Sequence, residues 1–156
     1  TSVSAWVLPM PAIEDARTAP PQHDAPPAAH LRVDEPWAFD IGFDAWLKRE
    51  GASPIRLSTT NASTLYWTAP QQIAHLTSNG TPIRAGDLIA TGTISGDDRS
   101  SLGSLVEITD NGTRPLMVGG RESTFLEDGD EVVLTAKANL GGGRLAPLGE
   151  VRGRVV

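Results

Sequence analysis

Alternation of large apolar and smaller residues between positions 37 and 43 is the feature that most constrains this fold. The large residues occupy every second position: Trp37, Phe39, Ile41 and Phe43. A period of two is expected of a β-strand that buries one face. The segment therefore predicts a strand around which a β fold can be built.

Most of the remaining sequence is also typical of strands joined by turns. The segments with strand character are 3–8, 55–59, 87–91, 104–109, 115–118, 131–137 and 150–156. Asn111-Gly112 favours a hairpin turn, and Gly141-Gly142-Gly143 the end of another, since no Lys-Ser/Thr follows to complete a phosphate loop. Gly and Pro make 28 of the 156 residues, which is high for a helical protein. We therefore expect a mainly β fold, rolled or barrel-like.

One short helix is expected after residue 60. Its apolar stripe consists of Leu65, Ala69, Ile73 and Leu76. Pro70 would cost about 3 kcal/mol inside a helix, so the helix either bends near Trp67 or begins at Pro70. We favour the bent helix. Residues 14–36, which are rich in proline, predict a long surface connection in an extended conformation.

Charge and composition argue against several classes of partner. The formal charge of −6 would repel a phosphate backbone, so we expect no nucleic-acid binding. No apolar run approaches the roughly 20 residues that span a bilayer, so we expect no membrane association. The chain has no cysteine, which fits a reducing compartment and makes the cytoplasm the expected location.

Two features between Gly86 and Thr109 are candidates for chemistry. In Thr91-Gly92-Thr93-Ile94-Ser95-Gly96, glycines flank hydroxyl residues, so backbone could approach a ligand while Thr93 or Ser95 donates a hydrogen bond. The alternative is an ordinary strand-ending turn. Glu107 lies in an apolar segment, where burial would raise its pKa or require a partner such as an imidazole. The alternative is a carboxylate that faces solvent.

No metal site is evident from spacing alone. His23, His30 and His75 do not have ligand spacing, and we expect surface or core-edge positions for them. The acidic clusters at 34–35 and 127–130 more often mark solvated turns than cation sites.

A set of motifs distributed along the whole chain carries a resemblance to a known family. In chain order they are Trp6-Val7-Leu8-Pro9-Met10, Asp34-Glu35-Pro36, Tyr66-Trp67-Thr68, Gln71-Gln72, Ser78-Asn79-Gly80, Arg84, Gly86-Asp87-Leu88, Gly92-Thr93-Ile94-Ser95-Gly96, Gly103-Ser104, Glu107 and Phe125-Leu126-Glu127-Asp128-Gly129-Asp130-Glu131-Val132. In order and spacing they resemble the fumarylacetoacetate hydrolase family. The Thr-Gly-Thr-Ile-Ser-Gly form is similar to the fumarylacetoacetase branch, whereas relatives that act on other acylpyruvates typically carry Thr-Gly-Thr-Pro.

The resemblance implies a homodimeric catalytic domain with a β-roll fold. It implies hydrolysis of a carbon–carbon bond in 4-fumarylacetoacetate to fumarate and acetoacetate, in tyrosine and phenylalanine catabolism. It also implies a divalent cation, Mg²⁺ or Ca²⁺, and a His–Glu pair that activates water. Glu107 matches the carboxylate of that pair, Thr93 a substrate-binding threonine, and Thr1 a threonine that helps complete the cation site.

The family's other functional residues belong upstream of Thr1. They are the acidic metal ligands, the catalytic histidine, and the arginine, glutamine and lysine that stabilise the carbanion. We therefore expect residues 1–156 to be the C-terminal portion of a longer enzyme, inactive alone and completed by the N-terminal remainder. The alternatives are a noncatalytic β module that kept the fold, and a hydrolase of related acylpyruvates or diketones.

Overall fold

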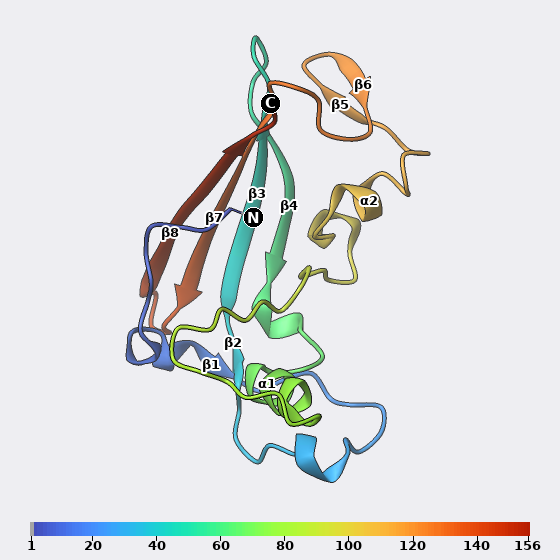
Figure 1. The fold of residues 1–156 in the computed structure, drawn as a ribbon. Coiled ribbons are helices and arrows are strands. Elements are labelled where there is room, and N and C mark those ends of the chain that lie inside the picture. The colour runs from blue at the N-terminus through green and yellow to red at the C-terminus, as the bar shows by residue number, and fades with distance from the viewer. Residues whose placement is uncertain (1) are drawn as a thin grey trace.

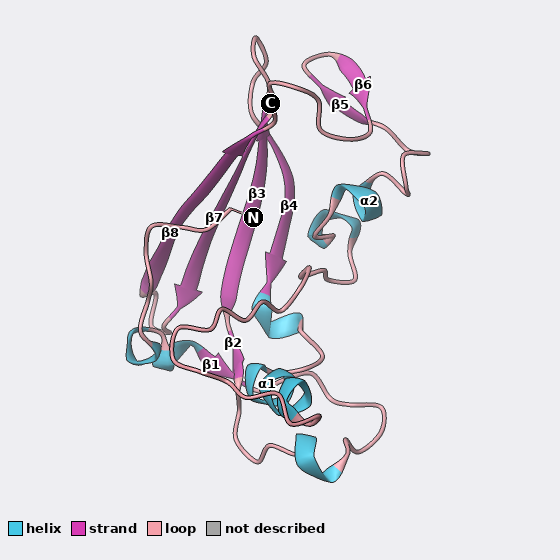
Figure 2. Ribbon diagram, in the orientation of Figure 1, coloured by secondary structure: helices cyan, strands magenta, loops and turns pink. Residues whose placement is uncertain are grey.

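A four-stranded antiparallel sheet is the main body of the computed structural model, which describes residues 2–156 (Figure 1). Its spatial order is β4 (Ile55–Asn61), β3 (Ile41–Lys48), β7 (Glu131–Asn139) and β8 (Leu145–Arg154). Strands hold 28% of the residues and helices 18%, so the prediction of a mainly β fold is confirmed. Across the described residues the sheets remain open and do not close into a barrel (Figure 2).

The alternating segment predicted as a strand forms β2 (Ala38–Phe39) and the start of β3. Asp40 separates the two strands, and its carboxylate accepts hydrogen bonds from Asn61 Nδ2 at 2.7 Å and Asn139 Nδ2 at 2.9 Å. Asp40 thereby links β3 to the ends of both neighbouring strands. The adjoining core consists of Ile13, Ala16, Ile41 and Ala138, with Phe39 and Phe43 partly buried against it.

The hairpin between β7 and β8 ends at the glycine triplet, as predicted. Gly141, Gly142 and Gly143 have φ of 75°, 58° and 78°. This left-handed conformation is strained for residues that carry a Cβ. Leu140 and Arg144 flank the triplet, and the Leu140 N–H donates to the Arg144 carbonyl at 2.9 Å.

Residues 2–37 contain little regular structure. The strand expected at 3–8 does not form, and the chain instead makes the 3₁₀ helices η1 (Met10–Ala12) and η2 (Glu14–Ala16). The proline-rich connection then includes β1 (Arg17–Thr18), which pairs with β2, and the 3₁₀ helix η3 (Ala29–Leu31). A further 3₁₀ turn, η4 (Ala62–Thr64), follows β4.

The expected helix is α1 (Ala69–Thr77), and our preference for a bend near Trp67 was wrong. The Gln71 side-chain oxygen accepts from the Thr68 N–H at 2.9 Å and the Thr68 hydroxyl at 3.0 Å, which closes the first turn. Pro70 therefore lies in that turn, where its missing N–H has no helical partner to lose. Leu65 precedes the helix.

Three predictions between residues 87 and 112 were wrong. Residues 87–91 pair with no described strand, and 104–109 contain the short helix α2 (Leu105–Ile108). Asn111-Gly112 follows α2 instead of closing a hairpin, with φ of 55° and 84°. The small hairpin of β5 (Leu116–Val118) and β6 (Arg121–Ser123) comes next. None of the described helices is long and apolar enough to cross a membrane.

Candidate functional site

Glu107 lies within a cage of serine hydroxyls. Ser104 Oγ donates to Glu107 Oε2 at 2.7 Å, and Ser95 Oγ lies 2.9 Å from both carboxylate oxygens. The carboxylate therefore has hydroxyl partners from two segments of chain. The structure satisfies the expectation of a partner for Glu107, but within residues 2–156 that partner is hydroxyl and not imidazole.

The local sequence explains how α2 places Glu107. Ser104 caps the helix by accepting the Glu107 N–H at 3.3 Å, and its own hydroxyl bonds the Glu107 carboxylate. Ser104-Leu105-Val106-Glu107 is the Ser-x-x-Glu pattern of a helix start, the signal that the prediction of a strand missed. The sequence had indicated Ser104 only as part of a family motif, and not as a partner of Glu107.

The second hydroxyl partner of Glu107, Ser95, comes from the Gly92–Gly96 segment. This segment packs closely on residues 101–104. The Gly96 N–H donates to the Ser101 carbonyl at 2.8 Å, and the Gly103 N–H donates to Ser95 Oγ at 3.0 Å. A Cβ on Gly103 would collide with the Ile94 carbonyl oxygen and lie 2.6 Å from Thr93 Cγ2. Glycine at 103 is therefore required for this approach.

The hydroxyl cage lowers the pKa of Glu107 from its ordinary value. The Ser104 hydroxyl makes the largest contribution and the Ser95 hydroxyl the next, because hydrogen bonds to a carboxylate favour its charged form. Partial burial acts in the opposite direction but is the weaker effect. Of the two outcomes expected for Glu107, a raised pKa or a partner, the structure shows a partner, and the hydroxyls favour the charged carboxylate.

Thr93 lies in the same segment as Ser95 and its side chain is exposed. Its hydroxyl makes no hydrogen bond to another described residue, whereas its methyl faces Gly103. Thr93 thus lies two residues before Ser95, which bonds Glu107, and its methyl lies against Gly103. Thr1, the third residue expected here, lies outside the described residues.

Among the described residues, none of the three histidines hydrogen-bonds Glu107, Ser95 or Ser104. His23 stacks on Tyr66, with ring centroids 4.4 Å apart, and its Nε2 lies 2.9 Å from the Tyr66 carbonyl. His30 is in η3 and His75 in the last turn of α1. Residues 2–156 hold no group of three or more His, Asp or Glu side chains that could bind a metal ion.

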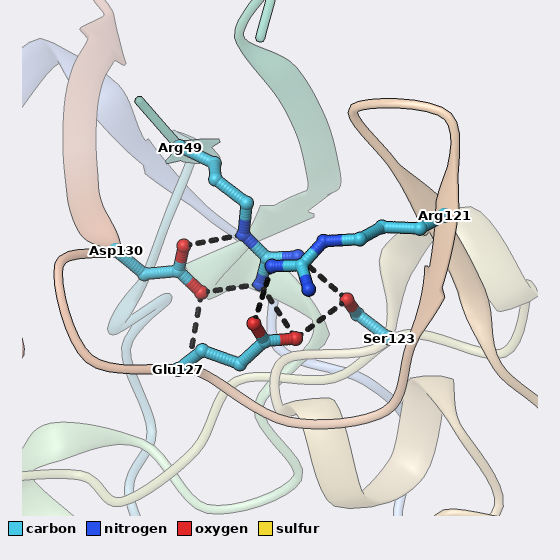
Figure 3. A network of polar contacts seen from close by, with 5 residues as sticks. All are labelled: Arg49, Arg121, Ser123, Glu127 and Asp130. Carbon is cyan, nitrogen blue, oxygen red and sulfur yellow. Dashed lines mark hydrogen bonds and ion pairs between the residues drawn. The ribbon is translucent and has the colours of Figure 1, made fainter. Parts of the chain in front are cut away.

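A second polar network joins β3, β6 and β7 and was not anticipated (Figure 3). Arg49 donates from Nε and Nη2 to the two oxygens of Asp130 and from Nη1 to Ser123 Oγ, each at 2.7 Å. Ser123 in turn donates to Glu127 at 3.0 Å, and Arg121 pairs with Glu127 at 2.6 Å. Asp130, in the acidic cluster at 127–130, is therefore buried in an internal clasp with Arg49, whereas Asp128 is exposed in a turn, as the sequence suggested.

Comparison with known proteins gives consistent matches over the whole chain. The family described as "Fumarylacetoacetate (FAA) hydrolase C-terminal" matches residues 1–156. The chain is 40% identical to the fumarylacetoacetase of Homo sapiens over 158 residues and 40% identical to that of Arabidopsis thaliana over 157, alignments that cover all of this chain. It is 42% identical to the fumarylacetoacetase of Oryza sativa subsp. japonica over 137 residues, 87% of this chain.

The alignments cover only part of those relatives: 38% of the human protein, 37% of the Arabidopsis protein and 32% of the rice protein. The chain thus spans less than two fifths of the length of the curated relatives it matches. The match of the C-terminal family to every residue, together with these identities, shows the family. The chain belongs to the fumarylacetoacetate hydrolase family, in its C-terminal region.

Proposed function

We propose that this chain is part of a fumarylacetoacetase that hydrolyses the carbon–carbon bond of 4-fumarylacetoacetate to fumarate and acetoacetate. The observation that carries the proposal is Glu107, a carboxylate held ionised by Ser104 and by Ser95, which lies two residues after Thr93. A site that maintains a charged, oriented carboxylate in a hydroxyl cage suits acid–base chemistry better than simple packing. The names of the similar proteins support the substrate class.

In the proposed mechanism Glu107 orients a histidine of the active site. That histidine belongs to the part of the enzyme outside residues 2–156. A carboxylate that accepts the N–H of an imidazole fixes its tautomer and makes its other nitrogen a stronger base, which removes a proton from water. The Thr93 hydroxyl, free of partners among the described residues, donates a hydrogen bond to the substrate. Attack of the activated water on a carbonyl then releases acetoacetate as a stabilised carbanion, which is protonated.

The cation that the resemblance implies has no set of ligands in residues 2–156. We propose that Mg²⁺ or Ca²⁺ is bound mostly by acidic residues of the N-terminal remainder of the enzyme, with Thr1 contributing to that site. Such an ion would act as a Lewis acid toward the diketone oxygens.

The wider assembly is proposed on the same resemblance. The enzyme is a cytoplasmic homodimer with a β-roll catalytic domain, and its partners are the N-terminal remainder and a small diketo acid. This chain by itself is inactive, because it supplies Glu107 and Thr93 without the histidine.

An assay with two samples tests the proposal. The full-length enzyme and residues 1–156 alone are each given 4-fumarylacetoacetate, and loss of its ultraviolet absorbance is followed with fumarate and acetoacetate measured as products. The full-length enzyme should release both in equal amounts, and the isolated chain neither. Absence of hydrolysis by a folded full-length enzyme would refute the proposed function.

A further inference from the structure

The two serines around Glu107 have restricted hydrogen-bond roles. A hydroxyl has one proton to donate and two lone pairs that accept. Ser95 Oγ accepts the Gly103 N–H at 3.0 Å, and Ser104 Oγ accepts the Glu107 N–H at 3.3 Å. Because an ionised carboxylate can only accept, each hydroxyl directs its single proton toward Glu107 while it accepts a backbone N–H.

The two oxygens of Glu107 are not equivalent in this arrangement. Oε2 receives the Ser104 proton at 2.7 Å, and Ser95 can give its one proton to either oxygen at 2.9 Å. A carboxylate oxygen can accept two hydrogen bonds. When Ser95 bonds Oε2, Oε2 is fully occupied and Oε1 is free. When Ser95 bonds Oε1, each oxygen holds one serine proton and has room for one further donor. Oε1 can therefore accept a further donor in both arrangements, and Oε2 in only one of them.

We propose that Ser95 and Ser104 are positioning residues that orient Glu107 so that Oε1 is the oxygen presented to the N–H donor of the catalytic site. Neither serine contacts substrate in this inference. Each acts through Glu107, Ser104 from the start of α2 and Ser95 from the glycine-flanked segment. The catalytic consequence rests on the proposed function, whereas the effect on the carboxylate does not.

Charged side chains near Glu107 are few and do not replace this role. Among the described residues no ion pair includes Glu107. Asp97 and Asp98 follow the Gly92–Gly96 segment, and the next element, η5 (Arg99–Ser101), begins with Arg99. Arg99 is engaged elsewhere, with the Ile108 carbonyl at 2.7 Å and Asp110 at 3.4 Å. The two hydroxyls are therefore the main groups that favour the charged form, and the backbone of Ser104 and Gly103 contributes less.

The arrangement assigns different consequences to the two serines. Ser104 is both a helix cap and a carboxylate partner, so its loss disturbs the start of α2 as well as the oxygen it bonds. Ser95 is not a cap, and its loss removes a partner of the carboxylate and the acceptor of the Gly103 N–H, while α2 keeps its Ser104 cap. Ser95→Ala is therefore the cleaner test, and Ser104→Thr, which keeps a hydroxyl, is the conservative variant.

The experiment is made in the full-length enzyme with Ser95→Ala, Ser104→Ala and Ser104→Thr. Ser100→Ala is the matched control, because Ser100 is an exposed serine of η5 whose hydroxyl bonds no other described residue. Two readouts are taken. The pKa of Glu107 is measured by ¹³C NMR of labelled glutamate side chains, assigned by the signal lost in Glu107→Gln, and kcat and KM are measured on 4-fumarylacetoacetate.

The pKa of Glu107 should rise in both alanine variants and stay unchanged in Ser104→Thr and Ser100→Ala. In the alanine variants kcat should fall roughly tenfold, the effect of losing one charge-assisted hydrogen bond, while KM stays within about twofold. An unchanged pKa in folded Ser95→Ala, or a loss confined to KM, would overturn the inference. If the wild-type enzyme does not hydrolyse the substrate, the proposed function fails, and the pKa readout still tests the orientation of Glu107.

Discussion

Arg49 and Asp130 form a bidentate ion pair in which Nε–Oδ1 and Nη2–Oδ2 are both 2.7 Å. Their side chains are 10% and 1% exposed. Arg49 directly follows β3 and Asp130 directly precedes β7, so the pair extends the β3–β7 register beyond Lys48 and Glu131. Arg49 also donates to Ser123 of β6, so the pair links the ends of β3 and β7 to the β5–β6 hairpin.

Removing Arg49 should cost far more stability than removing an exposed arginine. Arg49→Leu leaves the Asp130 carboxylate buried without its cation, which should lower the free energy of unfolding by about 3–5 kcal/mol. Arg144→Ala is the control, because its pair with Asp15 has both side chains more than 60% exposed and should contribute roughly 0–1 kcal/mol. Urea unfolding of both variants measures this, and equal losses would contradict the role of the clasp.

The same pair predicts how stability depends on acid pH. The Arg49 hydrogen bonds hold the pKa of Asp130 below its ordinary value, and burial opposes them less strongly. A carboxylate with a depressed folded pKa stabilises the protein above its unfolded pKa, which is about 3.9 for Asp, and loses that contribution as pH falls through the folded value.

Urea unfolding should therefore show stability falling between about pH 5 and the folded pKa of Asp130. In Arg49→Leu the acid-side slope should be shallower, because the pKa of Asp130 is no longer held down. Parallel pH curves for the wild type and this variant would contradict the assignment to Asp130.

Gly103→Ala should disturb the candidate site through backbone contact. The new methyl would meet the Ile94 carbonyl oxygen and Thr93 Cγ2, so the glycine-flanked segment must move. Overpacking of this kind typically costs 1–3 kcal/mol. Gly42→Ala is the control, since a Cβ there meets nothing within 4 Å. Unfolding and activity of both variants can be compared, and a Gly103 variant as stable and active as Gly42→Ala would refute this close packing.

Thr93→Val should separate binding from folding. The Thr93 side chain is exposed and its hydroxyl bonds no other described residue, so valine should leave the free energy of unfolding within about 0.5 kcal/mol. In the full-length enzyme kcat/KM should fall roughly fivefold to tenfold, the effect of one lost hydrogen bond to substrate. Steady-state kinetics with a parallel unfolding curve checks both parts. An unchanged kcat/KM would refute the proposed hydrogen bond from Thr93 to the substrate.

Local pattern predicted the central strands because their hydrophobic period is set within a few residues. Phe39, Ile41 and Phe43 alternate over a span longer than any turn, and the structure places them in β2 and β3. The same reasoning failed at Leu105, Val106 and Ile108, since a short apolar run fits a strand and a helical turn equally well. The feature that favours the helix is the N-cap Ser104, and a single capping residue is easily missed beside an apolar run.

The candidate site was predicted more by resemblance than by local pattern. Neither spacing nor composition places Ser95 beside Glu107, because the two belong to segments brought together by the close approach at Gly103. The Arg49–Asp130 pair joins residues 81 positions apart, and no periodicity in the sequence reports it. Contacts that depend on strand pairing and loop packing appear only once the fold is known.

The role of Glu107 is tested most directly by the turnover of 4-fumarylacetoacetate by the full-length Glu107→Gln enzyme. Glutamine keeps the shape of the side chain but removes the charge that the Ser95 and Ser104 hydroxyls stabilise. We expect kcat to fall by roughly 100-fold or more, as for loss of effective general-base catalysis, while the unfolding curve still shows a folded protein. Wild-type kcat in a folded Glu107→Gln enzyme would contradict it.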